Sequence, residues 1–402
     1  MDKKIDRPNL VGSYNPVLTG VDVESPLSIG NSSFSFTCDP TGLQSLYDVY
    51  RDAHIPLCTM AGWAWHTSPA PTPSGIYTYN DLDMDELPYR DRMVLHAVHK
   101  TGRTGHVYDW LRMNPHRYNL GRIGFLLDGK PLHLDDVASI HQELDLYRGR
   151  LTSSFTLNGC PCEVRTAVHG QASVLGIEVD SALLDSGRLT VCLAFPYGSP
   201  DISGSDWDQL QAHTTTDLSN NDGRLVLSRV MDTMVSYVAV TSETAMTITV
   251  PGVHHYVLAF PGMKSASISV EFSPELPVNI WRTADIFASA ALEWQSYWEQ
   301  GGMVDFSACT DPRAQELGRR VILSLYLQAI NSSDSFPPQE TGLFCNSWYG
   351  KSHLEMYPWH CMAPILWQRA SRISGSLEWY RNHVAEARNG AMRNHFKGTR
   401  PR

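Results

Sequence analysis

Residues 147–170 read YRGRLTSSFTLNGCPCEVRTAVHG and contain two short runs of strand-forming residues joined by an Asn-Gly pair. Such runs, rich in Val, Thr and Phe and bounded by turn residues, are typical of β-strands. Asn158 and Gly159 accept the positive φ angles of a tight turn at little cost. The stretch therefore predicts an antiparallel hairpin.

Runs of the same kind recur on both sides of this hairpin. From about Leu120 to Pro274 they follow one another with turn residues between them and no helical pattern, which favours a large antiparallel sandwich. Nearer the start, residues 24–36 run from a turn into a strand with Phe34 and Phe36 on one face. We expect an N-terminal β-sandwich domain over residues 1–278.

The pattern changes to helical spacing after the sandwich. Residues 283–302, TADIFASAALEWQSYWEQGG, place four apolar residues four apart: Ile286, Ala290, Trp294 and Trp298. Thr283 is the expected N-cap and the Gly-Gly pair is the expected end. A single amphipathic helix between two parts of a chain predicts a connector, here within residues 279–304, whose tryptophans pack at a domain boundary.

The remaining residues, 305–402, carry helical patterns. Asp311-Pro312 predicts a helix start, with a helix running to about Ile330. A second helix is expected from near Ser352 to about Arg369, and a third along 377–391. The prolines inside the second predict a kink or a later start.

The stretch after the first of these helices, residues 337–369, contains aromatic residues close to charged ones. It reads PPQETGLFCNSWYGKSHLEMYPWHCMAPILWQR. Sugars need flat apolar faces for their C–H surfaces and a few fixed polar groups for their hydroxyls. The composition therefore predicts a sugar site. Its candidate contacts are Glu340, Trp348, Tyr349, Lys351, His353 and Glu355, together with Trp63, Trp65 and His66 if the loop after residues 58–69 reaches it.

Structural roles compete with each of these contacts. Ser352 to Glu355 matches a capping box, in which the glutamate caps a helix. Glu340 and Lys351 form an exposed ion pair in another interpretation. The tryptophans, including Trp63 and Trp65 on one side of a predicted strand, are also common core residues.

Metal binding is not predicted. His353 and His360 are seven residues apart, no HExxH motif is present, and no Cys pair completes a tetrahedral set. We expect neither a metal nor a cofactor, and the eight scattered cysteines favour free thiols.

The composition narrows the class of partner. The 402-residue chain is 42% hydrophobic and 18% charged, with a formal net charge of −10, which argues against nucleic acid or an anionic membrane as partner. Positive residues gather only from Arg381 to Arg402, and a short basic end is usually solvated. No signal peptide or membrane span is recognisable, so we expect a soluble, cytoplasmic protein.

A family resemblance supports the sugar interpretation. Glu24-Ser-Pro-Leu-Ser-Ile-Gly-Asn31 is similar to the E-S-L-x-x-L-G-N-G opening of family 65 glycoside hydrolases and phosphorylases, with Ser32 in place of the last glycine. Residues 350–357 occupy the place of the family's G-H-x-x-W-D-x-E segment, whose W-D pair grips the non-reducing sugar. Leu354 replaces that tryptophan and Glu355 that aspartate.

The resemblance implies an α+β multidomain fold: an N-terminal antiparallel super-sandwich, a connector helix, and a partial (α/α)6 toroid of the six-hairpin glycosidases over residues 305–402. It implies an inverting glycoside hydrolase that acts on an oligosaccharide or other α-linked glycoside. A glycoside phosphorylase and a non-catalytic carbohydrate-binding or structural fragment remain as alternatives.

The resemblance also predicts an incomplete barrel. The family's general acid lies several helical hairpins further along, and a complete barrel needs on the order of 250 residues, whereas 100 residues follow Gly302. We therefore expect a chain truncated within the catalytic barrel, with unidentified catalytic residues and little O-glycosyl hydrolase activity of its own.

Overall fold

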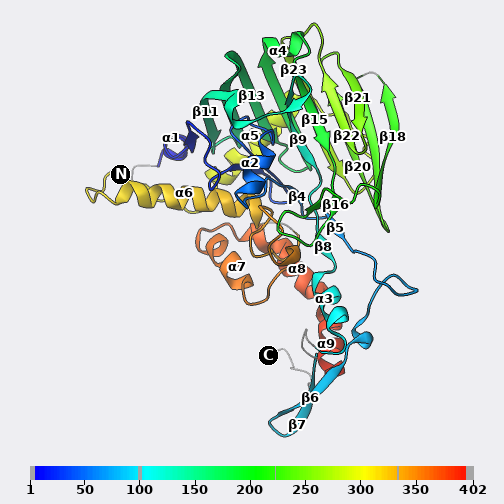
Figure 1. The fold of residues 1–402 in the computed structure, drawn as a ribbon. Coiled ribbons are helices and arrows are strands. Elements are labelled where there is room, and N and C mark those ends of the chain that lie inside the picture. The colour runs from blue at the N-terminus through cyan, green and yellow to red at the C-terminus, as the bar shows by residue number, and fades with distance from the viewer. Residues whose placement is uncertain (1–4, 98–101, 222, 333–334, 395–402) are drawn as a thin grey trace.

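The computed structural model describes residues 5–97, 102–221, 223–332 and 335–394. A β-rich body lies at the top of Figure 1, helix α6 runs along its lower side, and further helices and a long hairpin extend below. No helix in these ranges has the length and apolar character needed to cross a membrane. The last residues of the basic end, from Lys397, lie outside the described ranges.

Two antiparallel sheets form the body and share one hydrophobic core. The larger sheet contains, in spatial order, β1 (Val17–Leu18), β11 (Val137–Asp145), β12 (Arg150–Leu157), β13 (Cys160–Val168), β14 (Val174–Ser181), β23 (Ser265–Ser273), β20 (Met234–Ser242), β19 (Arg224–Met231) and β18 (His213–Asn221). The smaller sheet contains β10 (Lys130–Pro131), β9 (Arg122–Leu127), β15 (Leu189–Ala194), β22 (His255–Ala259) and β21 (Thr247–Gly252). The predicted β-sandwich is thus present.

Short elements surround the two sheets. The small strand groups are β2 (Leu27–Gly30), β3 (Phe34–Cys38) and β4 (Thr59–Ala61), then β5 (Trp65–His66) with β8 (His116–Arg117), β6 (Met84–Tyr89) with β7 (Arg92–Ala97), and β16 (Tyr197–Gly198) with β17 (Ser205–Asp206). The short helices are α1 (Arg7–Gly12), α2 (Tyr47–Asp52), α3 (Gly105–Met113) and α4 (Ala182–Asp185).

The predicted hairpin at residues 147–170 is β12–β13. Leu157 pairs with Cys160 across a turn in which Asn158 has φ 48° and Gly159 φ 80°. Along β12, Leu151 and Phe155 are buried and alternate with more exposed residues. Local turn chemistry and burial of one face therefore account for this hairpin.

The motif Glu24 to Asn31 leads into the turn of the first hairpin, β2–β3. Phe34 and Phe36 lie in the strand β3, as predicted, and both are fully buried. The Asn31 side chain accepts hydrogen bonds from the backbone N–H groups of Ser33 and Phe34, at 3.1 and 2.9 Å, and so fixes the turn. Ser32, which stands where the family pattern has glycine, has φ 85°, a backbone conformation that favours glycine.

Helix α5 (Thr283–Glu299) joins the two parts of the chain, and it contacts β12, β13, β14 and β23 of the larger sheet. Trp294 stacks on Tyr326 of α6, with ring centroids 4.4 Å apart, and Trp298 donates a hydrogen bond of 2.7 Å to the Leu146 carbonyl. Both tryptophans thus pack between the larger sheet and α6, whereas the division of the chain into domains stays a prediction. Thr283 is the first helical residue rather than the N-cap.

The helical part consists of α6 (Ala314–Asn331), α7 (Tyr357–Leu366), α8 (Ser374–Asn382) and α9 (Val384–Arg393). Helix α6 begins at Ala314, later than predicted, although the Asp311 carboxylate accepts hydrogen bonds from both the backbone N–H and the guanidinium of Arg313, at 2.9 and 2.8 Å. The second predicted helix is shorter, with α7 starting next to Pro358. The third is split at His383.

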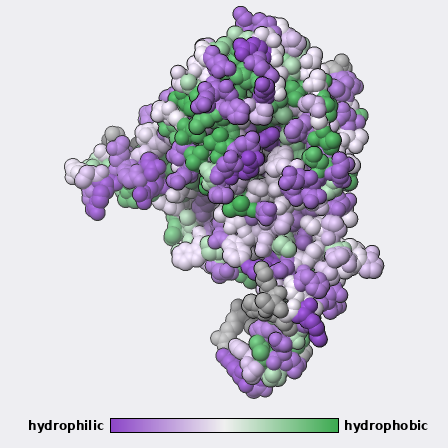
Figure 2. Space-filling model, viewed as in Figure 1, coloured by the Kyte–Doolittle hydropathy of each residue, from purple (hydrophilic) through white to green (hydrophobic). Residues whose placement is uncertain are grey.

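All eight cysteines are free thiols, as predicted. On the face seen in Figure 2, apolar residues gather over the body, and the projecting end of α6 is mostly polar. Helix α7 is different, because four of its apolar residues are exposed: Trp359, Met362, Ile365 and Leu366. Core packing, the competing interpretation for the tryptophans of residues 337–369, is therefore wrong for Trp359.

Candidate functional site

The stretch at residues 337–369 is tied to the sandwich by one buried asparagine. The backbone N–H of Asn346 donates to the Ile202 carbonyl at 2.7 Å, and its side-chain amide donates to the carbonyls of Ser199 and Asp201 at 3.2 and 3.1 Å. A β-bridge between Gln339 and Ser352 closes the loop that contains Asn346. The loop is therefore a positioned element of the structure.

The backbone of this loop is strained. Trp348, Tyr349 and Gly350, in the 3₁₀ turn Ser347–Gly350, have φ angles of 47°, 64° and 72°. A left-handed conformation costs an L-residue about 1–2 kcal/mol, and such strain persists where the surroundings impose it, often at functional sites. Gly350 is required here, because a Cβ atom would lie 2.7 Å from the side chains of both Arg117 and Asn346.

Lys351 holds the loop against helix α3. Its ammonium group donates three hydrogen bonds, to the carbonyls of Leu111 at 3.1 Å, Arg112 at 2.8 Å and Asn114 at 2.7 Å. Burial lowers the pKa of Lys351 to about 8. All three ammonium protons are used, so the predicted Glu340–Lys351 ion pair does not form and Lys351 has no proton left for a sugar hydroxyl.

A hollow of about 500 Å³ lies beside this loop. It brings together the six predicted contacts from residues 337–369 and adds one side chain from α3. The lining residues are Arg112, Glu340, Trp348, Tyr349, Lys351, Ser352, His353, Glu355 and Met356.

Trp348 is the main apolar surface of the hollow, and its side chain is 48% exposed. The Arg112 guanidinium carbon lies 5.1 Å from the centre of the Trp348 ring, and the His353 ring lies edge-on at 5.7 Å. Arg112 was not predicted as a contact, because nothing in the sequence links α3 to a loop more than 200 residues later. A half-exposed indole between two polar groups is a suitable surface for a sugar ring.

Two carboxylates line the hollow. Glu340 accepts a hydrogen bond from the Ser347 hydroxyl at 3.3 Å, and Glu355 lies 3.6 Å from His353 Nδ1. The Glu355 side chain is 77% exposed. The predicted capping box from Ser352 to Glu355 is wrong, because Ser352 pairs with Gln339 and α7 begins after Glu355, at Tyr357.

Trp63, Trp65 and His66 do not line this hollow. Trp63 follows β4 in a turn, packs against the main core and donates to the Ser173 hydroxyl at 3.3 Å, whereas Trp65 lies in β5, so the two do not share one side of a strand. The Arg117 guanidinium stacks over the Trp65 ring at 4.4 Å and donates to the Gly350 carbonyl at 3.3 Å. Trp65 therefore packs on Arg117, and Arg117 in turn binds the loop.

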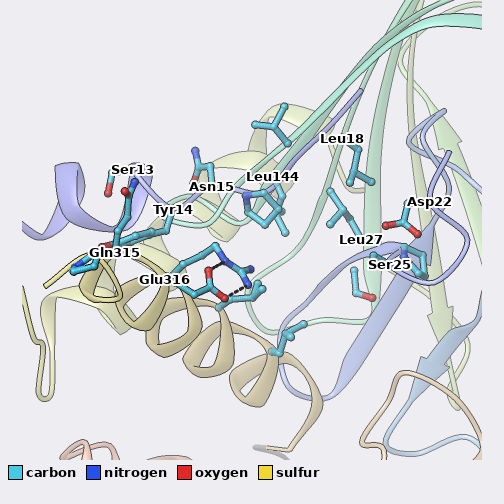
Figure 3. Close-up of a pocket in the computed structure, with 18 residues that line it drawn as sticks. Ser13, Tyr14, Asn15, Leu18, Asp22, Ser25, Leu27, Leu144, Gln315 and Glu316 are labelled. Carbon is cyan, nitrogen blue, oxygen red and sulfur yellow. Dashed lines mark hydrogen bonds and ion pairs between the residues drawn. The ribbon is translucent and has the colours of Figure 1, made fainter. Parts of the chain in front are cut away.

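A metal site and a second, larger hollow are less suitable as the functional site. Among the described residues, no group of three or more His, Cys, Asp or Glu side chains is placed to hold a metal ion. A larger hollow of about 820 Å³ lies between residues 13–28 and α6 (Figure 3). None of the predicted contacts lines it, and its Glu316 is already paired with Arg319 and Arg320 at 2.8 Å.

The fold and the hollow define a two-part protein, a β-sandwich with a helical part that carries an aromatic and acidic site. Among solved structures, it is similar to a candidate kojibiose phosphorylase from the human microbiome, with a TM-score of 0.57 and 12% sequence identity. The match covers 94% of this chain and 50% of that enzyme, so the chain spans about half its length. At this identity the similarity concerns the fold alone.

Other similarities are weaker. A family 92 α-mannosidase from Bacteroides thetaiotaomicron, solved with mannoimidazole, has a TM-score of 0.31 and 9% identity, with 82% of this chain and 41% of that one covered. A family 36 α-galactosidase from Geobacillus stearothermophilus has a TM-score of 0.22 and 11% identity, with 62% and 40% covered. These scores are too low to carry an argument. No protein-family profile and no curated protein matches the sequence.

Proposed function

We propose that the hollow around Trp348 binds a sugar and that the chain belongs to a carbohydrate-active enzyme for α-linked glycosides. The observation that carries the proposal is the half-exposed Trp348 ring, held in a strained turn beside two carboxylates and the Arg112 guanidinium. The fold similarity to a glycoside phosphorylase supports it. The division of the chain after residues 278 and 304, and membership of α6 to α9 in an (α/α)6 toroid, are part of the same proposal.

Two reactions are consistent with this site. An inverting hydrolase uses two carboxyl groups about 6.5–9.5 Å apart, one as acid and one as base for water. A phosphorylase uses phosphate in place of the base and water. Glu340 and Glu355 are the carboxylates at the hollow, but we assign them no catalytic role, because the resemblance implies a general acid from a later hairpin.

Product analysis separates these reactions. The chain is incubated with α-linked glucose disaccharides, including kojibiose, with and without inorganic phosphate. Free glucose in both samples indicates hydrolysis, and glucose 1-phosphate in the phosphate sample indicates phosphorolysis. Sugar binding without either product is the outcome expected of a chain whose general acid lies in a later hairpin, and it also fits the alternative, a non-catalytic carbohydrate-binding protein.

We expect Trp348→Ala to weaken sugar binding by about tenfold or more, because the variant loses the apolar face on which a pyranose ring packs. Isothermal titration with a small panel of mono- and disaccharides measures the effect. Trp359→Ala is the matched control, since Trp359 is also exposed but lies outside the hollow. Equal affinity of the wild type and Trp348→Ala for every bound sugar contradicts the proposed site.

For Glu355→Gln we expect a loss of affinity of about 10- to 150-fold, corresponding to hydrogen bonds to a charged group of roughly 1.5–3 kcal/mol. The melting temperature should not change, because Glu355 is exposed and caps no helix. Glu378→Gln, at an exposed ion pair of α8, is the control. Unchanged affinity excludes Glu355 as a sugar contact.

A further inference from the structure

A chain of hydrogen bonds connects β5 and β8 to the turn between β19 and β20. Nε2 of His66 lies 2.8 Å from the Asp232 carboxylate, and Nδ1 of His66 lies 3.1 Å from Nε2 of His116. The Tyr197 hydroxyl donates to the same Asp232 oxygen at 2.6 Å. Both histidines are buried. The bonds join segments that are 50 and 166 residues apart in the sequence.

When Asp232 is ionised, the donor and the acceptor of each hydrogen bond in this series are fixed. A carboxylate only accepts, so Nε2 of His66 must donate to Asp232. A neutral His66 then accepts at Nδ1, and Nε2 of His116 donates to it. This leaves Nδ1 of His116 without a proton, and this buried atom has no hydrogen-bond partner of normal geometry. An additional proton would have to be placed on it, where only the backbone of Met113 and Gly198 favours it.

Protonation of both histidines therefore works against this arrangement. If both histidines are charged, two N–H groups face each other across the 3.1 Å contact. Burial, and next the charge of His66, lower the pKa of His116 to about 4, while the backbone of Met113 and Gly198 opposes this shift. Burial also lowers the pKa of His66, against the opposing effect of Asp232.

The surrounding titratable groups do not replace Asp232 as a partner. Tyr197 binds Asp232, and the stacked pair His213 and His254 lies beyond Tyr197. The groups that act on this region from the neighbouring elements are Tyr197 (β16), Asp206 (β17), His213 (β18), Arg229 (β19), His254 before β22, and Lys351.

Strands β5 and β8 also contact the Trp348 loop, through side chains on the face opposite the histidines. In the β5–β8 pair, His66 is opposite His116 and Trp65 is opposite Arg117. Successive side chains of a strand point to opposite faces, so the histidines and the Trp65–Arg117 contact lie on opposite sides. Arg117 donates to the Gly350 carbonyl. A pair of two-residue strands is marginal without additional contacts.

We propose that Asp232, His66 and His116 form a proton-sensitive brace that holds the β5–β8 pair, and through Arg117 the Trp348 loop, and that releases both when its histidines are protonated. The three residues are positioning residues for the site, because none of them lines the hollow. The effect on ligand affinity rests on the proposed function, whereas the effect on the loop does not.

Hydrogen exchange with Asp232→Asn tests the brace without any ligand. Asparagine tolerates the left-handed backbone of this turn, where Asp232 has φ 50°. The substitution removes the charge that holds His66. We expect the protection factors of peptides covering 64–67, 114–118 and 346–352 to fall about tenfold at pH 7.

Asp128→Asn is the matched control, because Asp128 also has a left-handed turn conformation, with φ 51°, and pairs with Arg188 away from the site. It should leave all three peptides unchanged. A similar loss in the control, or a loss confined to 64–67 and 114–118, overturns the proposal. If Asp232→Asn does not fold, Tyr197→Phe, which removes only one bond to Asp232, is tested in the same way.

The pH dependence provides the second test. The open segment binds protons with an ordinary histidine pKa near 6.5, so opening is favoured by up to about tenfold per pH unit for each histidine below that value. Exchange of wild-type peptide 346–352, corrected for intrinsic rates, should therefore rise between pH 7.0 and 5.5. A constant protection factor contradicts the brace. Absence of sugar binding at both pH values contradicts only the proposed function.

Discussion

Replacing Trp298 with alanine is expected to lower the free energy of unfolding by about 3–5 kcal/mol, the cost usual for removing a buried tryptophan. Trp298 is fully buried between α5 and the sandwich. Its ring packs edge-on against Tyr297 at 5.0 Å, and its indole N–H is bonded to the Leu146 carbonyl. Alanine leaves a cavity and an unpaired carbonyl at the junction of the two parts.

Guanidinium unfolding followed by circular dichroism measures this loss. Leu292→Ala is the control, because Leu292 lies on the same helix and is 69% exposed. We expect a change of less than about 0.5 kcal/mol for the control, as for most surface substitutions. A loss below about 1 kcal/mol for Trp298→Ala would show that α5 is not the structural link between the two parts.

A second large effect is expected on acidification. Burial lowers the pKa of His116 to about 4 and that of His213 to about 3. In the unfolded chain histidines bind protons near pH 6.5, so the unfolded state holds more protons below that pH. Stability should therefore fall as pH decreases from 6.5 towards 4, by up to about 1.4 kcal/mol per pH unit for each such histidine.

One carboxyl group opposes this trend. Burial raises the pKa of Asp39 to about 6, so the folded state binds that proton between about pH 6 and 4 and offsets roughly one histidine. A net loss remains because both His116 and His213 contribute, and burial also lowers the pKa of His66. The loss is expected to be steepest below about pH 6, where the unfolded histidines are almost fully protonated, and to flatten towards pH 4, where His116 also binds its proton in the folded state.

The unfolding free energy is measured from pH 7.5 to 4.5 for the wild type and for His213→Phe. Phenylalanine keeps an aromatic ring beside His254, on which His213 stacks at 3.7 Å, but it takes up no proton. We expect the slope against pH to decrease by the equivalent of about one proton. His141→Phe, at an exposed position of β11, should keep the wild-type slope, and an unchanged slope in His213→Phe contradicts the assignment.

The parts of the fold that were predictable from sequence depend on contacts between neighbours in the chain. The β12–β13 turn needs only an Asn and a Gly that accept positive φ, and α5 needs only apolar residues four apart. The grouping of Trp348, His353 and Glu355 in one hollow was also predictable, because they lie within eight residues. The sugar-binding role itself stays a prediction.

Errors arose where a distant partner replaced the local one. Ser352 matches an N-cap, yet it pairs with Gln339, so the helix begins later. Lys351 was expected to contact sugar or Glu340, yet its ammonium group binds three carbonyls at the end of α3. Arg112 was missed for the same reason, since its place beside Trp348 depends on α3 packing against the loop.

The sequence by itself thus determined the strands, their tight turns, the connector helix and the residue types of the candidate site, because periodicity and turn chemistry act over a few residues. Only the tertiary structure decided which charged groups are free. Lys351 is held by carbonyls about 240 positions away in sequence, while Glu355 stays exposed at the hollow. A buried ammonium group must be satisfied by hydrogen bonds, and the acceptors that satisfy it come from whichever segment the fold packs against it.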